Sequence, residues 1–113
     1  MSEDLTLDDL AVPLRALRLL AADLGHLPAP DVDVTQIYPS TLRLSFHRGG
    51  LAAFEVWRET LGIAPGKVRH GTQAGGHTRV LRAEVQYAGA ELELVAYADV
   101  HTPAPSSAEG VAA

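Results

Sequence analysis

The residues with the clearest chemical potential are basic side chains gathered in the middle of the chain. Residues 34–83 contain seven arginines and lysines but only two acids, Glu55 and Glu59, whereas the segments on either side are acidic. Guanidinium groups bind phosphate and carboxylate through paired hydrogen bonds. We therefore expect a surface that binds an anionic partner. Its candidate residues are Arg43, Lys67, Arg69, His77, Arg79 and Arg82.

The other side chains that could do chemistry lack the spacing for it. His70 and His77 lie about four residues apart along a predicted hairpin, roughly 13 Å at ~3.3 Å per residue, which is too far for one metal ion. The serines stand outside the Gly-x-Ser-x-Gly setting of a strained nucleophile. The glycines of residues 71–76 have neither the Lys nor the helix of a phosphate loop. The chain has no cysteine. We expect a protein that is not an enzyme and uses no metal or cofactor.

The elements that position the basic residues include a meander of three strands. Gly75–Gly76 and Ala88–Gly89 are typical of tight hairpin turns. Pairing around the first turn sets Val68 opposite Ala83, and pairing around the second sets Ala83 opposite Leu94. Both registers gather apolar residues on one face, and a slip of one residue would destroy this agreement.

Local neutralisation is the other interpretation of the basic residues. In the predicted registers Arg69 lies directly opposite Arg82, and like charges that face each other across strands are unfavourable. Glu84 lies opposite Glu93 one step along the same face. These four side chains could neutralise one another as a checkerboard. The sequence therefore leaves open whether the arginines balance charges within the chain or bind a partner.

An amphipathic helix is predicted near the N-terminus. Pro13 suits the first turn of a helix and Gly25 is typical of the residue that follows one, so we expect the main helix between them. Thr6 and Asp9 have the spacing of a capping box and predict a separate turn ahead of it. The apolar stripe has members four and three residues apart, namely Leu10, Leu14, Leu17, Ala21 and Leu24.

A second helix and a first hairpin complete the predicted elements. Residues 51–61 carry an apolar stripe that includes Trp57, and Gly62 ends the segment. We expect Trp57 to pack in the core rather than to contact a ligand, and Arg58 to lie on the polar side. Residues 32–37 and 42–46 alternate polar and apolar side chains around a turn-forming segment, which predicts an antiparallel hairpin.

The order of these elements predicts an α+β fold. It is a two-layer sandwich, α-β-β-α-β-β-β, with two helices on one face of an antiparallel sheet. We expect one domain over residues 1–101, partly flexible at 1–9, and a disordered tail at 102–113. The N-terminal residues are acidic rather than signal-like, and no apolar run approaches the ~20 residues of a membrane helix. We therefore expect a cytoplasmic protein without a membrane partner.

Two stretches of the chain resemble small uncharacterised proteins of actinobacterial genomes and their mobile elements. They are Phe-Glu-Val-Trp-Arg-Glu-Thr-Leu-Gly-Ile at residues 54–63 and Tyr-Ala-Gly-Ala-Glu-Leu-Glu-Leu at 87–94. The resemblance covers roughly residues 42–98. Its motifs are helix-core and hairpin positions, so it implies no activity and no functional residue. It implies a bacterial or phage accessory role.

Three functions are consistent with these features. The leading hypothesis is a non-enzymatic binding or adaptor module that recognises a protein or small anionic ligand through a basic sheet face and the hairpin of residues 67–82. The alternative is a nucleic-acid-associated accessory protein, although the predicted solvent-exposed face lacks paired stacking aromatics and the net charge is −5. The third is a homodimer that pairs sheet surfaces or edges.

Overall fold

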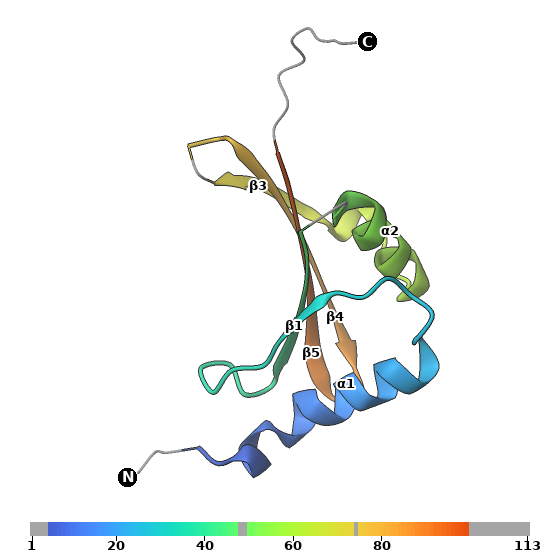
Figure 1. The fold of residues 1–113 in the computed structure, drawn as a ribbon, viewed down its shortest axis with the longest axis vertical. Helices are drawn as coiled ribbons and strands as arrows, with labels where there is room; N and C mark the ends of the chain where they lie inside the picture. The colour runs from blue at the N-terminus through green and yellow to red at the C-terminus, as the bar shows by residue number, and fades with distance from the viewer. Residues whose placement is uncertain (1–4, 48–49, 74, 100–113) are drawn as a thin grey trace, which may run out of the picture.

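Two α-helices and a five-stranded sheet make up the described part of the chain, which comprises residues 5–47, 50–73 and 75–99 of a computed structural model (Figure 1). The elements are η1 (Leu7–Leu10), α1 (Ala11–Asp23), β1 (Asp31–Asp33), β2 (Thr41–Phe46), α2 (Gly50–Thr60), η2 (Pro65–Lys67), β3 (Arg69–Gln73), β4 (Thr78–Tyr87) and β5 (Ala90–Asp99). The predicted α+β order is confirmed. The predicted tail at 102–113 lies outside the described residues. None of the helices in the described ranges has the length and apolarity to cross a membrane.

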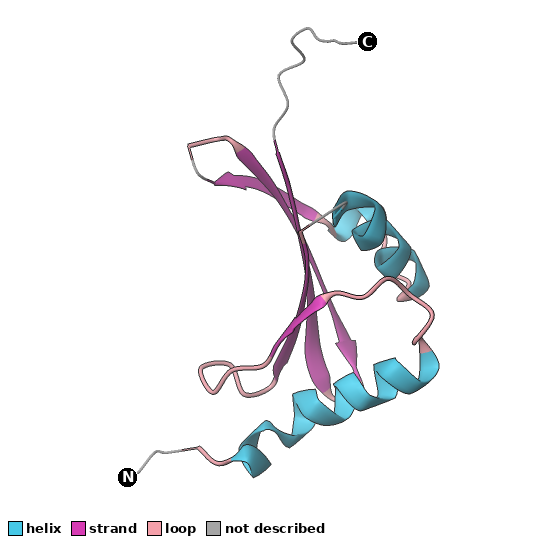
Figure 2. Cartoon of the chain, in the orientation of Figure 1, coloured by secondary structure: helices cyan, strands magenta, loops and turns pink. Residues whose placement is uncertain are grey.

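The sheet has the strand order β1-β2-β5-β4-β3, and both helices lie on one side of it (Figure 2). Three of the four strand pairs are antiparallel, but β2 and β5 run parallel. The prediction of a wholly antiparallel sheet is therefore wrong at its centre. A parallel pair needs a long crossover connection, and α2 with the β3–β4 hairpin provides one here.

The predicted meander is confirmed in both turns and both registers. Arg69 pairs with Arg82 around the first turn, and Ala83 pairs with Leu94 around the second. The glycines of both turns have positive φ angles, as tight hairpin turns require. Ala88 shares this conformation with φ 52°, which is unfavourable for a residue with a side chain.

The core lies between the sheet and the two helices. Leu44 of β2 and Leu94 of β5 are fully buried there, as is Phe54 of α2. Trp57 is also buried, and its indole N–H donates a hydrogen bond of 2.8 Å to the carbonyl oxygen of Pro28. The prediction that Trp57 is a core residue is therefore confirmed. This bond also ties the connector after α1 to α2.

Helix α1 differs from its predicted stripe. Its buried residues are Pro13, Ala16 and Leu20, whereas Leu14 keeps 36% of its surface exposed and Ala21 is exposed. The helix begins at Ala11, so Pro13 sits in the first turn, where the backbone N–H groups have no partner within the helix. The side that meets the sheet is thus rotated away from the stripe that periodicity favours.

The first hairpin is shorter than the sequence predicts. β1 ends at Asp33, and the next residues form a loop in which Ile37 is 74% exposed and Tyr38 62% exposed. The backbone N–H of Tyr38 donates to the hydroxyl oxygen of Thr35 at 3.3 Å, a local turn contact that competes with strand pairing. This contact accounts for the early end of β1.

Arg58 is buried, contrary to the prediction that it lies on the polar side of α2. It is only 7% exposed, and its Nη1 donates to the carbonyl oxygen of Ile63 at 2.6 Å. Its Nε and Nη2 donate to the two carboxylate oxygens of Glu55 at 3.0 and 2.9 Å. These hydrogen bonds hold the pKa of Glu55 below its usual range and raise the pKa of Arg58. Arg58 therefore joins the middle of α2 to the turn that follows it.

The lowered pKa of Glu55 predicts a pH-dependent contribution to stability. The contribution is complete above the ordinary glutamate pKa of about 4.3 and is lost as the pH falls through the lowered value. Glu55→Gln should therefore have a lower free energy of unfolding than the wild type near neutral pH, and this difference should shrink in acid. Urea unfolding at a series of pH values measures it. A difference that does not change with pH would contradict the assignment.

The backbone of Ala88 predicts a stabilising substitution. Asn tolerates a positive φ and favours this turn before Gly, so Ala88→Asn should raise the free energy of unfolding by on the order of 1 kcal/mol. Ala22→Asn is the matched control, because Asn is a weaker helix former than Ala and Ala22 is exposed in α1. The control should lower stability. An unchanged or lower stability of Ala88→Asn in urea unfolding would contradict the strain at this turn.

Candidate binding surfaces on the sheet and its hairpin

The face of the sheet away from the helices is the first candidate surface, and we call it the open face. No described helix lies on it (Figure 2). Residues that pair across strands point to the same face, so the register assigns its side chains. Its guanidinium groups belong to Arg43, Arg69 and Arg82. Its carboxylates belong to Asp31, Asp33, Glu84, Glu91, Glu93 and Asp99.

A hydrogen-bonded charge network occupies the centre of the open face. Arg43 Nε donates to Glu93 Oε1 at 2.9 Å, and Arg82 Nη1 approaches Glu93 Oε2 at 3.4 Å. The Glu93 side chain is only 12% exposed. The hydrogen bond to Glu93 raises the pKa of Arg43, while burial acts in the opposite direction. One nearly buried carboxylate thus holds two guanidinium groups from the strands on either side of it.

A second ion pair lies further toward the hairpin edge. Arg69 Nη2 donates to Glu84 Oε2 at 3.0 Å, and both side chains are well exposed. Arg69 and Arg82, although directly opposite each other, therefore each have a glutamate partner. Of the two interpretations that the sequence allowed for Arg69 and Arg82, the structure shows neutralisation within the chain.

The open face is not basic, contrary to the expected basic sheet face. It holds six carboxylates and three guanidinium groups in the described residues. All three guanidinium groups have glutamate partners within the chain. An incoming anion would have to compete with these glutamates. Of the two candidate surfaces, the open face is the less suitable for an anion.

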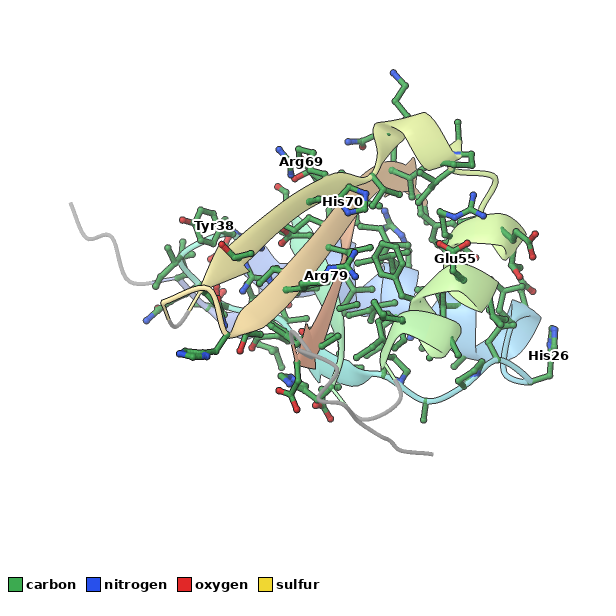
Figure 3. The ribbon with its side chains drawn as sticks, turned by 90° about the horizontal axis from the view of Figure 1, so that it is seen from above. His26, Tyr38, Glu55, Arg69, His70 and Arg79 are labelled. Carbon is green, nitrogen blue, oxygen red and sulfur yellow. The ribbon has the colours of Figure 1, made fainter. Side chains whose placement is uncertain are left out.

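The remaining predicted site residues lie on the hairpin of β3 and β4, the second candidate surface. Arg79 pairs with Thr72 and lies two positions before Leu81, a core residue of β4, so it is on the face toward the helices and not on the face of Arg43. Figure 3 shows His70 and Arg79 on the side of the hairpin toward α2 and Arg69 on the other side. Lys67 and His77 are exposed at opposite ends of the hairpin. In the described ranges neither Lys67 nor Arg79 forms an ion pair.

The hairpin projects from the body of the molecule. Its tip extends beyond the end of α2 in Figure 1, and all five residues of β3 are exposed. β3 pairs with β4 alone and forms an edge of the sheet. Strand β3 is therefore open to solvent on both of its faces, and the hairpin carries the cations that have no ion-pair partner in the described part of the chain.

One cluster on the open face was missed by the sequence interpretation. The rings of His47 and Tyr97 stack with their centroids 4.7 Å apart, and His47 Nε2 lies 3.6 Å from Asp31 Oδ2. These side chains come together because β2 and β5 are parallel, a pairing that local patterns do not reveal. A hollow of about 520 Å³ beside them is lined by Gln73 and Asp99 among others. No group of three or more His, Asp or Glu side chains in the described ranges is placed to hold a metal ion.

Comparisons with known proteins add no assignment. No family model matches the chain, and no curated protein or solved structure is detectably similar to it. The resemblance to small actinobacterial proteins therefore stays a prediction.

The two glutamates of the open face should differ in their contribution to stability. Glu93→Gln leaves two half-buried guanidinium groups without a full counter-charge and should lower the free energy of unfolding by about 1–2 kcal/mol. Glu84→Gln is the control, because its exposed ion pair should contribute less than about 1 kcal/mol. Urea unfolding of both variants at neutral pH measures the difference. Equal and small losses would show that the central network is not a stabilising contact.

Proposed function

We propose that this protein is a non-enzymatic binding module whose β3–β4 hairpin binds an acidic segment of a protein partner. The observation that carries the proposal is the exposure of Lys67 and Arg79 on a projecting hairpin with no ion-pair partner in the described residues. The chain has no acid between Thr60 and Ala83. A carboxylate from outside the chain can therefore reach these cations without displacing a partner from residues 5–47, 50–73 or 75–99.

The spacing of the cations favours an extended partner over a small anion. Lys67 precedes β3 by two residues, and Arg79 pairs with Thr72 in the second half of that strand. The two positions are thus roughly 16 Å apart at ~3.3 Å per residue along a strand. One phosphate or carboxylate could contact both cations only if the two long side chains extended fully toward each other. A segment with several acidic residues along its length can contact both without this constraint.

The electrostatics of the chain favour an acidic protein over a nucleic acid. The net charge of −5 repels any polyanion at long range, and it opposes a nucleic acid, which is charged at every phosphate, more than a protein segment with a few acidic residues. β3 contains no Phe, Tyr or Trp, so it offers no stacking platform for bases. The two hairpin cations supply only a small part of the phosphate neutralisation on which nucleic-acid affinity depends. An acidic peptide segment needs only a few matched contacts.

Charge reversal on the hairpin tests the proposal. The probe is a fluorescently labelled polyglutamate peptide, and its anisotropy is measured at low ionic strength. Lys67→Glu together with Arg79→Glu should weaken binding by about tenfold or more, because two favourable contacts become repulsive. The melting temperature should hardly change, since both side chains are exposed.

A matched control separates a local effect from one of net charge. Arg15→Glu together with Arg18→Glu makes the same change in charge at exposed positions of α1, at the other end of the molecule from the hairpin (Figure 1). This control should lose much less affinity. Absence of polyglutamate binding, or an equal loss in both double variants, would refute the proposal. Tighter binding to a single-stranded oligonucleotide of equal length would favour the nucleic-acid function instead.

A further inference from the structure

The outer side of α1 carries more apolar surface than the core uses. Leu7 is 71% exposed and Leu14 is 36% exposed, and Ala21 is exposed as well. These three residues are seven apart in the chain; Leu14 and Ala21 lie on one line of α1, and Leu7 lies in the turn η1 that precedes it. Leu10, Leu17 and Leu24 lie beside this line and are half-buried. The part of the apolar stripe that the core leaves uncovered is therefore continuous along the helix.

The spacing of these residues is that of a coiled-coil seam. From Leu7 to Leu24 these six apolar positions are alternately three and four residues apart, which is the a and d spacing of a heptad repeat. Leu7 and Leu10 lie in the 3₁₀ turn η1, in which residues three apart are eclipsed, so they keep the same line. We call this set the α1 seam. It consists of Leu7, Leu10, Leu14, Leu17, Ala21 and Leu24.

A hollow lies beside the C-terminal half of the seam. Leu17, Ala21 and Leu24 form one wall, and Leu27, Pro30 and Val32 contribute to the rest. Its volume is about 170 Å³, similar to that of an apolar cavity that accepts a benzene-sized group. The seam thus has a projecting leucine at its N-terminal end and an apolar hollow at its C-terminal end.

We propose that α1 pairs antiparallel with α1 of a second copy of this chain through the α1 seam. A two-fold axis between Leu14 and Leu17 sets Leu7 of one copy level with Leu24 of the second copy. The projecting end of each helix then lies against the hollow end of the other, and both contacts form at once. Such mutual complementarity is the property of a two-fold symmetric interface. A foreign helix would have to match both ends independently.

The charges of α1 allow this pairing. Asp8 and Asp23 lie on the opposite side of the helix from the seam, as their positions in the heptad show. Arg18 flanks the seam and comes level with Pro13 of the second copy, so no like charge faces it directly. Figure 1 shows no other described element along the lower side of α1. The contact is short for a stable interface, so we expect a dissociation constant on the order of micromolar.

Single substitutions on α1 test the dimer. The wild-type chain should show a mass that rises from monomer to dimer with concentration in sedimentation velocity, and its melting temperature should rise in parallel. Leu7→Glu and Ala21→Glu should remain monomeric, since both positions are exposed and the change affects only the seam. Leu19→Glu is the matched control, because Leu19 is 41% exposed on α1 but lies off the seam, and it should still dimerise.

The outcomes that overturn the proposal are specific. A wild-type chain that stays monomeric at all concentrations overturns it, and so does a loss of dimer in Leu19→Glu equal to that in Leu7→Glu. Because the chain has no cysteine, introduced thiols report the orientation. A mixture of Leu7→Cys and Leu24→Cys chains should form mainly the mixed disulfide on oxidation. A preponderance of the two symmetric disulfides overturns the antiparallel arrangement. Polyglutamate binding by the hairpin is expected to be unchanged in all α1 variants.

Discussion

The parallel pairing of β2 with β5 at the centre of the sheet is the contact on which most of the remaining structure depends. It sets Leu42 beside Leu92 and Leu44 beside Leu94, and all four side chains are fully buried. Both helices pack on these two strands. The connection between the strands contains α2 and the hairpin. The same crossover that covers the central strands with a helix therefore also carries the hairpin to the far edge of the sheet.

This pairing also decides how the charges are distributed. Arg43 and Glu93 are fifty residues apart in the chain and become neighbours only because β2 lies against β5. Arg43 is thereby neutralised, although it belongs to the most basic part of the sequence. Charge is instead separated across the sheet. Asp31 and Asp33 lie on β1 at one edge, and the cations that have no ion-pair partner among the described residues lie on the hairpin at the other edge. An anionic partner is consequently expected to bind at the hairpin rather than at the open face of the sheet.

Helix α1 shows how packing selects among the residues that periodicity offers. Its apolar positions cover far more of the helix surface than the sheet can bury. Pro13, Ala16 and Leu20 face the sheet, and the small side chain of Ala16 lets the helix approach it closely. The leucines of the α1 seam then lie on the side of the helix next to the buried one. The spacing of the apolar residues correctly predicts a helix. Part of the stripe, Leu14 and Ala21, nevertheless lies outside the core.

The sequence by itself determined the features that depend on neighbours in the chain. The glycine turns and the alternation of side chains specified the β3–β4 and β4–β5 registers, and Gly62 marked the end of α2, because these signals act within a few residues. The tertiary structure alone decided the parallel central pair, the side of α1 that is buried, and the burial of Arg58. Each of these depends on contacts between distant segments, or on which of several suitable surfaces packs best. The ion pairs of the open face depend on both local signals and tertiary contacts. The local registers align Arg69 with Arg82, whereas only the complete sheet brings Glu93 beside Arg43.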